Sequence, residues 1–184
     1  MASVLSHAIA ASAISAAFYR PSVPKRVWIV GIACSVFPDV DVIGFRFGIH
    51  YGDFWGHRGF THSLIFAVLL AAVLASGILR SQSAMSRVSL FAYLFLSTAS
   101  HGLLDAMTNG GLGVAFFSPF DNQRYFLPWR PIRVSPIGLL RFFSARGLAV
   151  IKSELLWIWL PSILATVLVT ISRKLRIAEP QSLR

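Results

Sequence analysis

Five apolar stretches, separated by polar or charged segments, follow one another along the chain. They cover residues 4–18, 27–38, 63–79, 88–104 and 155–172. A helix needs about 20 apolar residues to cross a bilayer, with a range of about 17–25. The last three stretches meet this requirement, whereas the first two do so only if polar residues at their ends are shielded by protein at membrane depth. The pattern predicts an all-α protein, an integral membrane bundle of about five helices.

The segment between the fourth and fifth stretches has a different character. It is rich in Gly, Pro and Phe, and it carries six basic residues between Arg124 and Lys152. We therefore expect a long interfacial loop region with short helices at the membrane face. The predicted organisation is a single membrane domain over residues 1–184, divided into a four-helix core (1–107), the interfacial region (108–152), a last transmembrane helix (153–176) and a tail (177–184).

Composition supports a membrane protein. Of the 184 residues, 55% are hydrophobic and only 13% are charged, about half the charged fraction of a typical soluble domain. Disorder is excluded by this composition, and a disulfide scaffold is excluded because Cys34 is the single cysteine. Residues 1–18 also contain an Ala-Ser-Ala site typical of a signal peptide, but no basic segment precedes them, which favours a membrane helix.

The net charge of +10 would suggest nucleic acid as a partner in a soluble protein. Here no nucleic-acid motif and no basic stripe interleaved with aromatic residues is present, and membrane proteins collect Lys and Arg in their flanking loops. We therefore expect membrane lipid, and no nucleic acid, as the partner.

Metal-binding side chains fall at one end of the predicted bundle. If the helices run alternately up and down, His7 begins the first, Asp39 and Asp41 end the second, His57 and His62 begin the third, and His101 and Asp105 end the fourth. We call this the ligand end, and the region 108–152 lies there as well. Ionisable residues in membrane spans are costly and usually functional, so their gathering predicts a metal site.

Spacing supports this convergence. His101 and Asp105 are four residues apart, so they lie on the same helix face. His57 and His62 would diverge on one continuous helix, and Gly56 and Gly59 favour a turn at His57. Mixed His and carboxylate ligands suit zinc, or manganese or iron where more oxygen ligands bind.

Two blocks of sequence carry a family resemblance. HRGFTHS at 57–63 and HGLLDAMT at 101–108, together with His7, PDVD at 38–41 and FSPF at 117–120, resemble the YdjM family of bacterial and archaeal inner-membrane proteins, which are described as metal-dependent hydrolases. The resemblance covers about residues 1–140. It implies a multi-pass protein of the inner (plasma) membrane with hydrolase activity.

The order of the ligands is also similar, more distantly, to that of the zinc-dependent phospholipase C and single-strand nuclease family. Those enzymes are all-helical and cleave phosphoesters with three zinc ions. The likeness implies one metal site made of Asp41 (or Asp39), one of His57 and His62, His101 and Asp105, with His7 at a second metal that shares Asp105. No histidine follows His101, so we expect one or two ions.

The predicted function is metal-dependent hydrolysis by activated water, because a bound metal lowers the pKa of water to about 7. Asp39 is the candidate general base. Arg58 is a candidate for binding an anionic oxygen, and the alternative is a salt bridge to Asp39, Asp41 or Asp53. Basic and aromatic residues of the interfacial region suit anionic lipid head groups, which suggests a phospholipid or another lipid-linked phosphoester as substrate, although membrane anchoring alone also explains them.

Two other functions compete with hydrolysis. The metal could be purely structural in a non-enzymatic membrane protein, because closed four-ligand sites are structural. A transporter is disfavoured, since no pair of broken helices recurs in two halves of the chain. Lys and Arg in short segments at the opposite end place the ligand end outside the cytoplasm. Glu154 and Glu179 flank the last helix, and no role is predicted for them.

Overall fold

The computed structural model describes residues 1–77, 85–137 and 142–178, and these residues form an all-helical fold. The elements are α1 (Val4–Phe18), α2 (Lys25–Val36) running into the 3₁₀ segment η1 (Phe37–Phe47), η2 (Phe60–His62), α3 (Leu64–Ser76), α4 (Arg87–Ala106), α6 (Ala145–Glu154), η4 (Leu155–Trp159) and α7 (Leu160–Ala178). In the described residues β-pairing is limited to two isolated bridges, Thr108 with Ile132 and Val114 with Tyr125. The prediction of an all-α protein with five long helices is confirmed.

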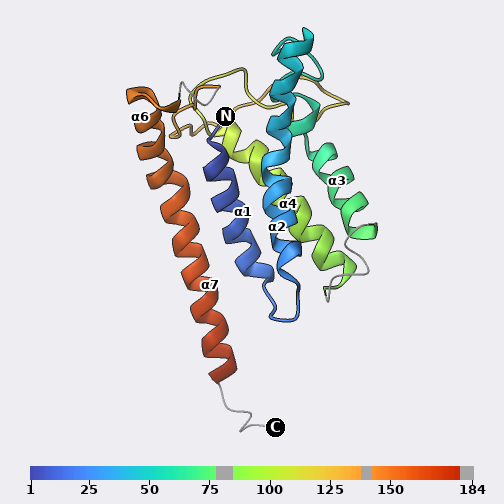
Figure 1. Cartoon of the computed structure of the whole chain (residues 1–184), viewed down its shortest axis with the longest axis vertical. Coiled ribbons are helices and arrows are strands. Elements are labelled where there is room, and N and C mark those ends of the chain that lie inside the picture. Colours follow the sequence, from blue (N-terminus) through green and yellow to red (C-terminus); the bar gives the residue numbers. More distant parts are fainter. Residues whose placement is uncertain (78–84, 138–141, 179–184) are drawn as a thin grey trace.

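Helices α1, α2, α3 and α4 form the bundle, and α6, η4 and α7 make one long continuous helix at its edge (Figure 1). The long helix packs against α1. The core between α2, α3 and α4 is apolar and includes Val27, Ala71, Leu90 and Leu94. Gly31 allows α2 and α4 to approach closely, since a Cβ there would lie only 2.1 Å from the hydroxyl of Tyr93. This packing fixes the two helices that bring Asp39 and His101 together.

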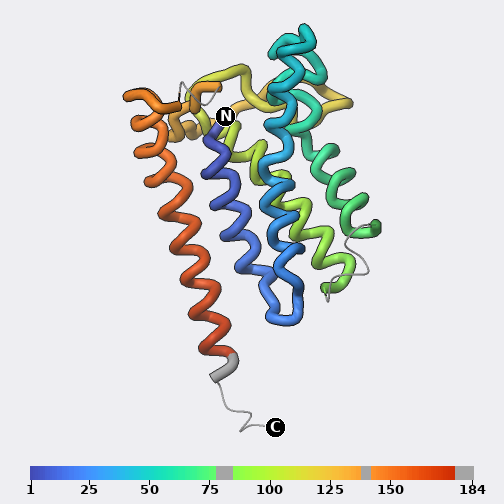
Figure 2. Tube along the Cα trace, viewed as in Figure 1, coloured from blue at the N-terminus to red at the C-terminus, as the bar shows by residue number. Residues whose placement is uncertain are grey.

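The first residues of the chain, η1, η2 and the segment after α4 all lie at one end of the bundle, as the tube in Figure 2 shows. Serine hydroxyls cap the helices that begin there: Ser3 accepts from the N–H of Ser6, and Ser63 accepts from the N–H of Phe66. Such caps satisfy backbone N–H groups that have no partner inside the helix. The ligand end is therefore where several helix termini and loops converge.

Two helix boundaries differ from the prediction. The last helix begins at Ala145 instead of residue 153, because Ser144 accepts a hydrogen bond from the N–H of Gly147 and caps it there. Helix α3 is described only to Ser76, where Gly77 follows, and the predicted continuation to residue 79 enters the range outside the described residues.

By length and composition, two described helices could cross a membrane. They are Lys25–Phe47, in which η1 extends α2, and Ala145–Arg176, while Val4–Phe18 and Leu64–Ser76 are apolar but shorter. Of the three stretches expected to be long enough to cross a membrane, only the last one forms a described helix of that length and apolar character. The second stretch, expected to be too short, also does so, because the chain continues as a 3₁₀ helix through Pro38.

Glu154, for which the sequence suggested no role, is fully buried and joins the long helix to α1. Its Oε1 accepts from the backbone N–H of Ser3 at 2.5 Å, and its Oε2 accepts from the hydroxyls of Ser3 at 2.5 Å and Ser6 at 2.8 Å. The indole N–H of Trp159 donates to the same Ser6 hydroxyl at 2.8 Å. A carboxylate at a helix N-terminus is also favoured by the helix dipole, so Glu154 holds the start of α1 in place.

Replacing Glu154 with Gln should destabilise the fold. The Gln amide group would turn N–H donors toward donors of Ser3 and Ser6, and a hydrogen bond to a charged group contributes about 1.5–3 kcal/mol. We expect the melting temperature in detergent to fall by roughly 3–12 °C. The control is Asp53→Asn, at a carboxylate whose side chain is 51% exposed, which should leave the melting temperature nearly unchanged. Equal melting temperatures for both variants would contradict the role of Glu154.

Candidate metal centre

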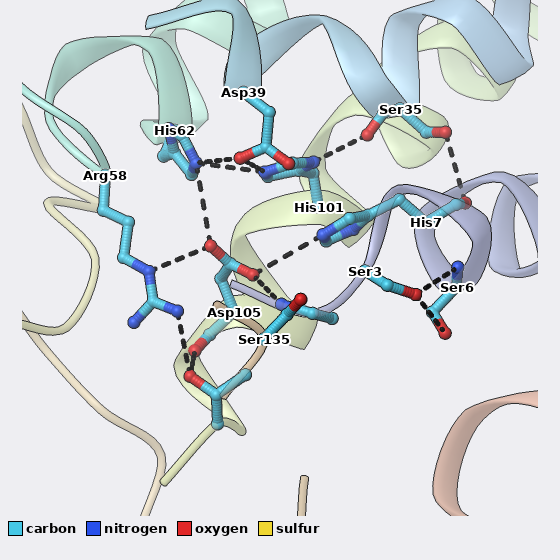
Figure 3. A network of polar contacts seen from close by, with 12 residues as sticks. Ser3, Ser6, His7, Ser35, Asp39, Arg58, His62, His101, Asp105 and Ser135 are labelled. Carbon is cyan, nitrogen blue, oxygen red and sulfur yellow. Dashed lines mark hydrogen bonds and ion pairs between the residues drawn. The ribbon is translucent and has the colours of Figure 1, made fainter. Parts of the chain in front are cut away.

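Four buried side chains from three elements meet at the ligand end (Figure 3). Asp39 comes from η1, His62 from η2, and His101 and Asp105 from α4. One donor atom from each side chain lies within 4.8 Å of the others. Segments far apart in sequence therefore place two imidazoles and two carboxylates around one point.

The separations between the donor atoms fit a tetrahedral metal ion. Nε2 of His62 lies 3.0 Å from Nε2 of His101, and Oδ1 of Asp39 lies 3.3 Å from Nε2 of His101 and 3.6 Å from Nε2 of His62. Ligand atoms about 2.0–2.1 Å from a tetrahedral zinc ion stand about 3.3–3.4 Å from one another. The donor atoms of Asp39, His62 and His101 bracket this value.

Hydrogen bonds on the far side of each imidazole orient the two rings. Nδ1 of His101 donates to the carbonyl of Ser35 at 2.7 Å, because a carbonyl can only accept. Nδ1 of His62 lies 3.2 Å from Oδ2 of Asp41, which also accepts from the hydroxyl of Thr61 at 2.8 Å. Metal-bound histidines use their second nitrogen in this way. With Nδ1 protonated in both rings, two Nε2 lone pairs face each other, and a cation between them removes the repulsion.

Pro38 removes one backbone donor that could otherwise occupy the Ser35 carbonyl, which accepts from His101. Helix α2 passes into the 3₁₀ segment η1 at Phe37, and in a 3₁₀ helix a carbonyl bonds to the N–H three residues later. For Ser35 that residue is Pro38, which has no N–H. Gly102 allows α4 to lie close to the backbone of η2, since a Cβ there would lie 2.9 Å from the carbonyl oxygen of His62.

Asp39 is the side chain that most needs a cation. It is buried, and neither of its carboxylate oxygens has a hydrogen-bond partner. Buried polar groups are nearly always hydrogen-bonded, and a buried charge is costly unless it is paired. The groups nearest to Asp39 are the Nε2 atoms of His62 and His101. A divalent ion among these three side chains would satisfy all of them, so the residues fit a metal.

Asp105 is held by several other groups. Its Oδ1 accepts from the backbone N–H of Ala2 at 2.7 Å, and its Oδ2 lies 2.9 Å from Nε of Arg58. Arg58 is fully buried and also donates to the carbonyl of Gly110 and the hydroxyl of Thr108, each at 2.9 Å. The ion pair of Arg58 is therefore with Asp105, and not with one of the three aspartates named in the salt-bridge alternative.

The remaining predicted ligands lie around this centre. Nδ1 of His57 donates to Oδ1 of Asp41 at 2.8 Å, and Asp41, His57 and His62 form a second group that could hold an ion. The ring of His7 stacks on that of His101 at 3.7 Å, with Nε2 of His7 3.5 Å from Oδ1 of Asp105. All the predicted ligands thus lie in one connected cluster, and Asp39 is the carboxylate nearest to the two facing Nε2 atoms.

The two histidines that precede α3 in the centre, His57 and His62, have opposite pKa shifts. Burial lowers the pKa of His57, and the hydrogen bond to Asp41 only partly opposes this. Burial also acts to lower the pKa of His62, but its contacts with Asp39 and Asp41 outweigh burial and raise the pKa to about 9. In the metal-free protein a proton on His62 therefore takes the place of a cation.

Several supporting groups could not be found from the sequence. The Ser35 carbonyl and the Ala2 N–H are backbone groups, which no residue pattern marks, although Pro38 hints that a carbonyl upstream is left free. Thr61 was within reach of the sequence, since it lies beside His62 and donates to Asp41. Glu154 had a signal too, because an acidic residue is rare in so apolar a helix.

Comparisons with known proteins show which proteins the chain is similar to. The chain matches the family model described as YdjM inner membrane protein over residues 1–177. It is 40% identical to the Inner membrane protein YbcI of Escherichia coli (strain K12) over 164 residues, which cover 89% of this chain and 94% of that protein. No solved structure matches the chain.

The purified protein should contain about one divalent metal ion per chain. His101→Ala should abolish this, because it removes an Nε2 donor and leaves a space in the shell, and metal content by mass spectrometry of the acid-digested protein measures it. His50→Ala is the matched control, since the side chain of His50 is 88% exposed. Wild-type protein that stays metal-free after incubation with zinc and desalting would contradict the metal centre.

Metal affinity should depend on pH through His62. Since the metal-free side chain has a raised pKa of about 9, it is protonated at pH 7 and must lose that proton to bind the ion. We expect the association constant to fall about tenfold per pH unit below pH 9 and to level off above it. Calorimetric titration with zinc between pH 7 and 10 measures this, and affinity that does not change between pH 7 and 9 would contradict it.

Proposed function

The chain belongs to the YdjM inner membrane protein family, and we propose that it is a membrane-embedded hydrolase that uses a divalent metal, zinc first, to cleave a phosphoester such as a phospholipid. Outward-facing apolar side chains on two helices support the membrane setting. They include Leu69 and Val73 on α3, and Ile163, Leu164 and Leu168 on α7, all more than half exposed. Side chains of this kind on one face suit lipid surroundings.

The observation that carries the proposal is the difference between the partners of Asp39 and those of Asp105. Asp39, His62 and His101 supply three donors with no competing cation, whereas Asp105 is already paired with Arg58 and the Ala2 N–H. Three protein ligands leave one position of a tetrahedral ion open, as in catalytic zinc sites. A bound divalent metal would lower the pKa of a water molecule there to about 7.

Asp105 is the group placed to move a proton at that position. Its Oδ2 lies 3.7 Å from Nε2 of His62. Arg58 fixes this carboxylate and keeps it ionised, so that it can accept a proton. The sequence pointed to Asp39 as the base, but its position between the two imidazoles favours a ligand role, and we assign the base to Asp105.

A structural metal is the second candidate, and one distance favours it. The same 3.7 Å separation between Oδ2 of Asp105 and Nε2 of His62 would allow Asp105 to act as a fourth ligand. The shell would then be closed, as in structural sites. The two candidates differ in whether Asp105 binds the ion.

Anionic lipid as the substrate class is supported by the surface beside the centre. Arg130 lies over the ring of Phe126 at 4.8 Å, and the side chains of Trp129, Phe120 and Phe143 are more than half exposed nearby in the chain. Arg124, by contrast, donates to the carbonyls of His57, Tyr51 and Asp53, and so supports the loop that carries His57. The Lys and Arg residues at the opposite end of the bundle lie in short segments, which weigh most in the positive-inside rule, and this supports an extracytoplasmic position for the centre.

Asp105→Asn separates the two candidates. If Asp105 is the base, the variant should keep its metal and lose turnover by about 10²–10⁴-fold. Formation of diacylglycerol or phosphatidic acid in phosphatidylglycerol vesicles, and product release from a panel of soluble phosphoesters, measure turnover, with His50→Ala as the unaffected control. Loss of the metal from Asp105→Asn, together with no turnover by the metal-loaded wild type, would overturn the hydrolase and favour the structural site.

A further inference from the structure

An apolar cavity of about 500 Å³ opens beside the metal centre. Its walls come from the start of α1, from η1 and from the segment before α6, and they include Val4, Leu5, Val42, Ile137, Phe142 and Phe143. The volume lies within the range of about 300–1,000 Å³ typical of ligand pockets. The cavity is therefore large enough for a ligand, and its lining indicates what kind.

Two walls of the cavity are built on the segments that hold the centre. Val42 directly follows Asp41, which bonds to the rings of His57 and His62. Ser3 lines the cavity and follows Ala2, whose N–H donates to Asp105. The cavity wall is thus one residue along the chain from Asp41 and from Ala2, both of which contact the carboxylate and imidazole cluster.

Neither serine in the described part of the lining has a free hydroxyl. The Ser3 hydroxyl is bonded to Glu154. The N–H of Ser135 donates to the carbonyl of Met1, and its hydroxyl donates to the carbonyl of Pro136. Apolar cavities of this kind stay dry and bind apolar molecules. Apart from the amino terminus of Met1, the described lining therefore suits hydrocarbon.

The mouth of the cavity is accessible from outside the bundle. Val4 is 47% exposed, Leu5 55% and Phe143 78%. For a chain of an inner-membrane family, the medium that meets such apolar side chains is lipid. A hydrocarbon chain can then enter sideways, without crossing the polar cluster.

We propose that this cavity binds one acyl chain of a membrane phospholipid and so places the phosphoester of that lipid at the metal centre. This inference rests on the proposed hydrolase function for its purpose, but binding of the chain can be measured without turnover. In this arrangement two different parts of the protein recognise the lipid. The His/Asp cluster binds its phosphate, and the cavity binds its long hydrocarbon chain.

Photo-crosslinking tests the proposal. The full-length protein is reconstituted into vesicles of phosphatidylethanolamine and phosphatidylglycerol that contain a trace of phosphatidylglycerol with a diazirine near the end of one acyl chain. We expect crosslinks, mapped by peptide mass spectrometry, to be enriched at least fivefold at the cavity residues over the outer faces of α3 and α7. Val42→Trp and Ile137→Trp, which fill the cavity from two sides, should each remove this enrichment.

Two controls separate this proposal from the hydrolase proposal. Val68→Trp, on the exposed face of α3, should leave the enrichment unchanged. Asp39→Asn should lose the metal and any turnover but keep the crosslinks, because the cavity is intact. Crosslinks spread evenly over the outer helix faces, or enrichment that survives both cavity substitutions in folded protein, would overturn the acyl-chain site.

Discussion

The carboxylate of Asp39 is buried against two imidazoles without a single hydrogen bond, and the rest of the ligand end depends on how that charge is satisfied. A proton on His62 can do so in part, which is why the contacts with Asp39 and Asp41 raise the pKa of that side chain. A divalent ion does so fully, because it meets both Nε2 lone pairs and the carboxylate together. The site could therefore exchange a proton for a metal ion.

Three further carboxylates keep this arrangement in place, each with its own partner. Asp41 bonds to Nδ1 of His57 and lies against Nδ1 of His62, and Asp105 pairs with Arg58. Glu154 binds the start of α1, which carries His7 and lies next to the Ala2 N–H. Apart from Asp39, each buried acid thus has a donor from the protein. Among these four carboxylates, Asp39 is the one without a donor from the protein, so it is the one that could bind an added cation.

Much of the fold could be predicted from hydrophobic pattern, because apolar helices of a bundle leave long uncharged runs. The convergence of the histidines and aspartates also followed from alternating helix direction. What the sequence could not show depends on backbone geometry. The roles of Asp39 and Asp41 depend on how a 3₁₀ helix orients two side chains that are two residues apart. The Ser35 carbonyl accepts from His101 beside Pro38, which offers no backbone donor. The use of Arg58 within the centre likewise required knowing where residues 108–110 fold back.

The central claim, that an ion binds between Asp39, His62 and His101, is tested most directly by anomalous diffraction from crystals of the zinc-loaded protein at the zinc absorption edge. The account predicts a single strong peak about 2.0–2.1 Å from Nε2 of both histidines and from an oxygen of Asp39. Nδ1 of His101 should still be bonded to the carbonyl of Ser35. A peak elsewhere, or none at these three side chains in fully loaded protein, would contradict the account.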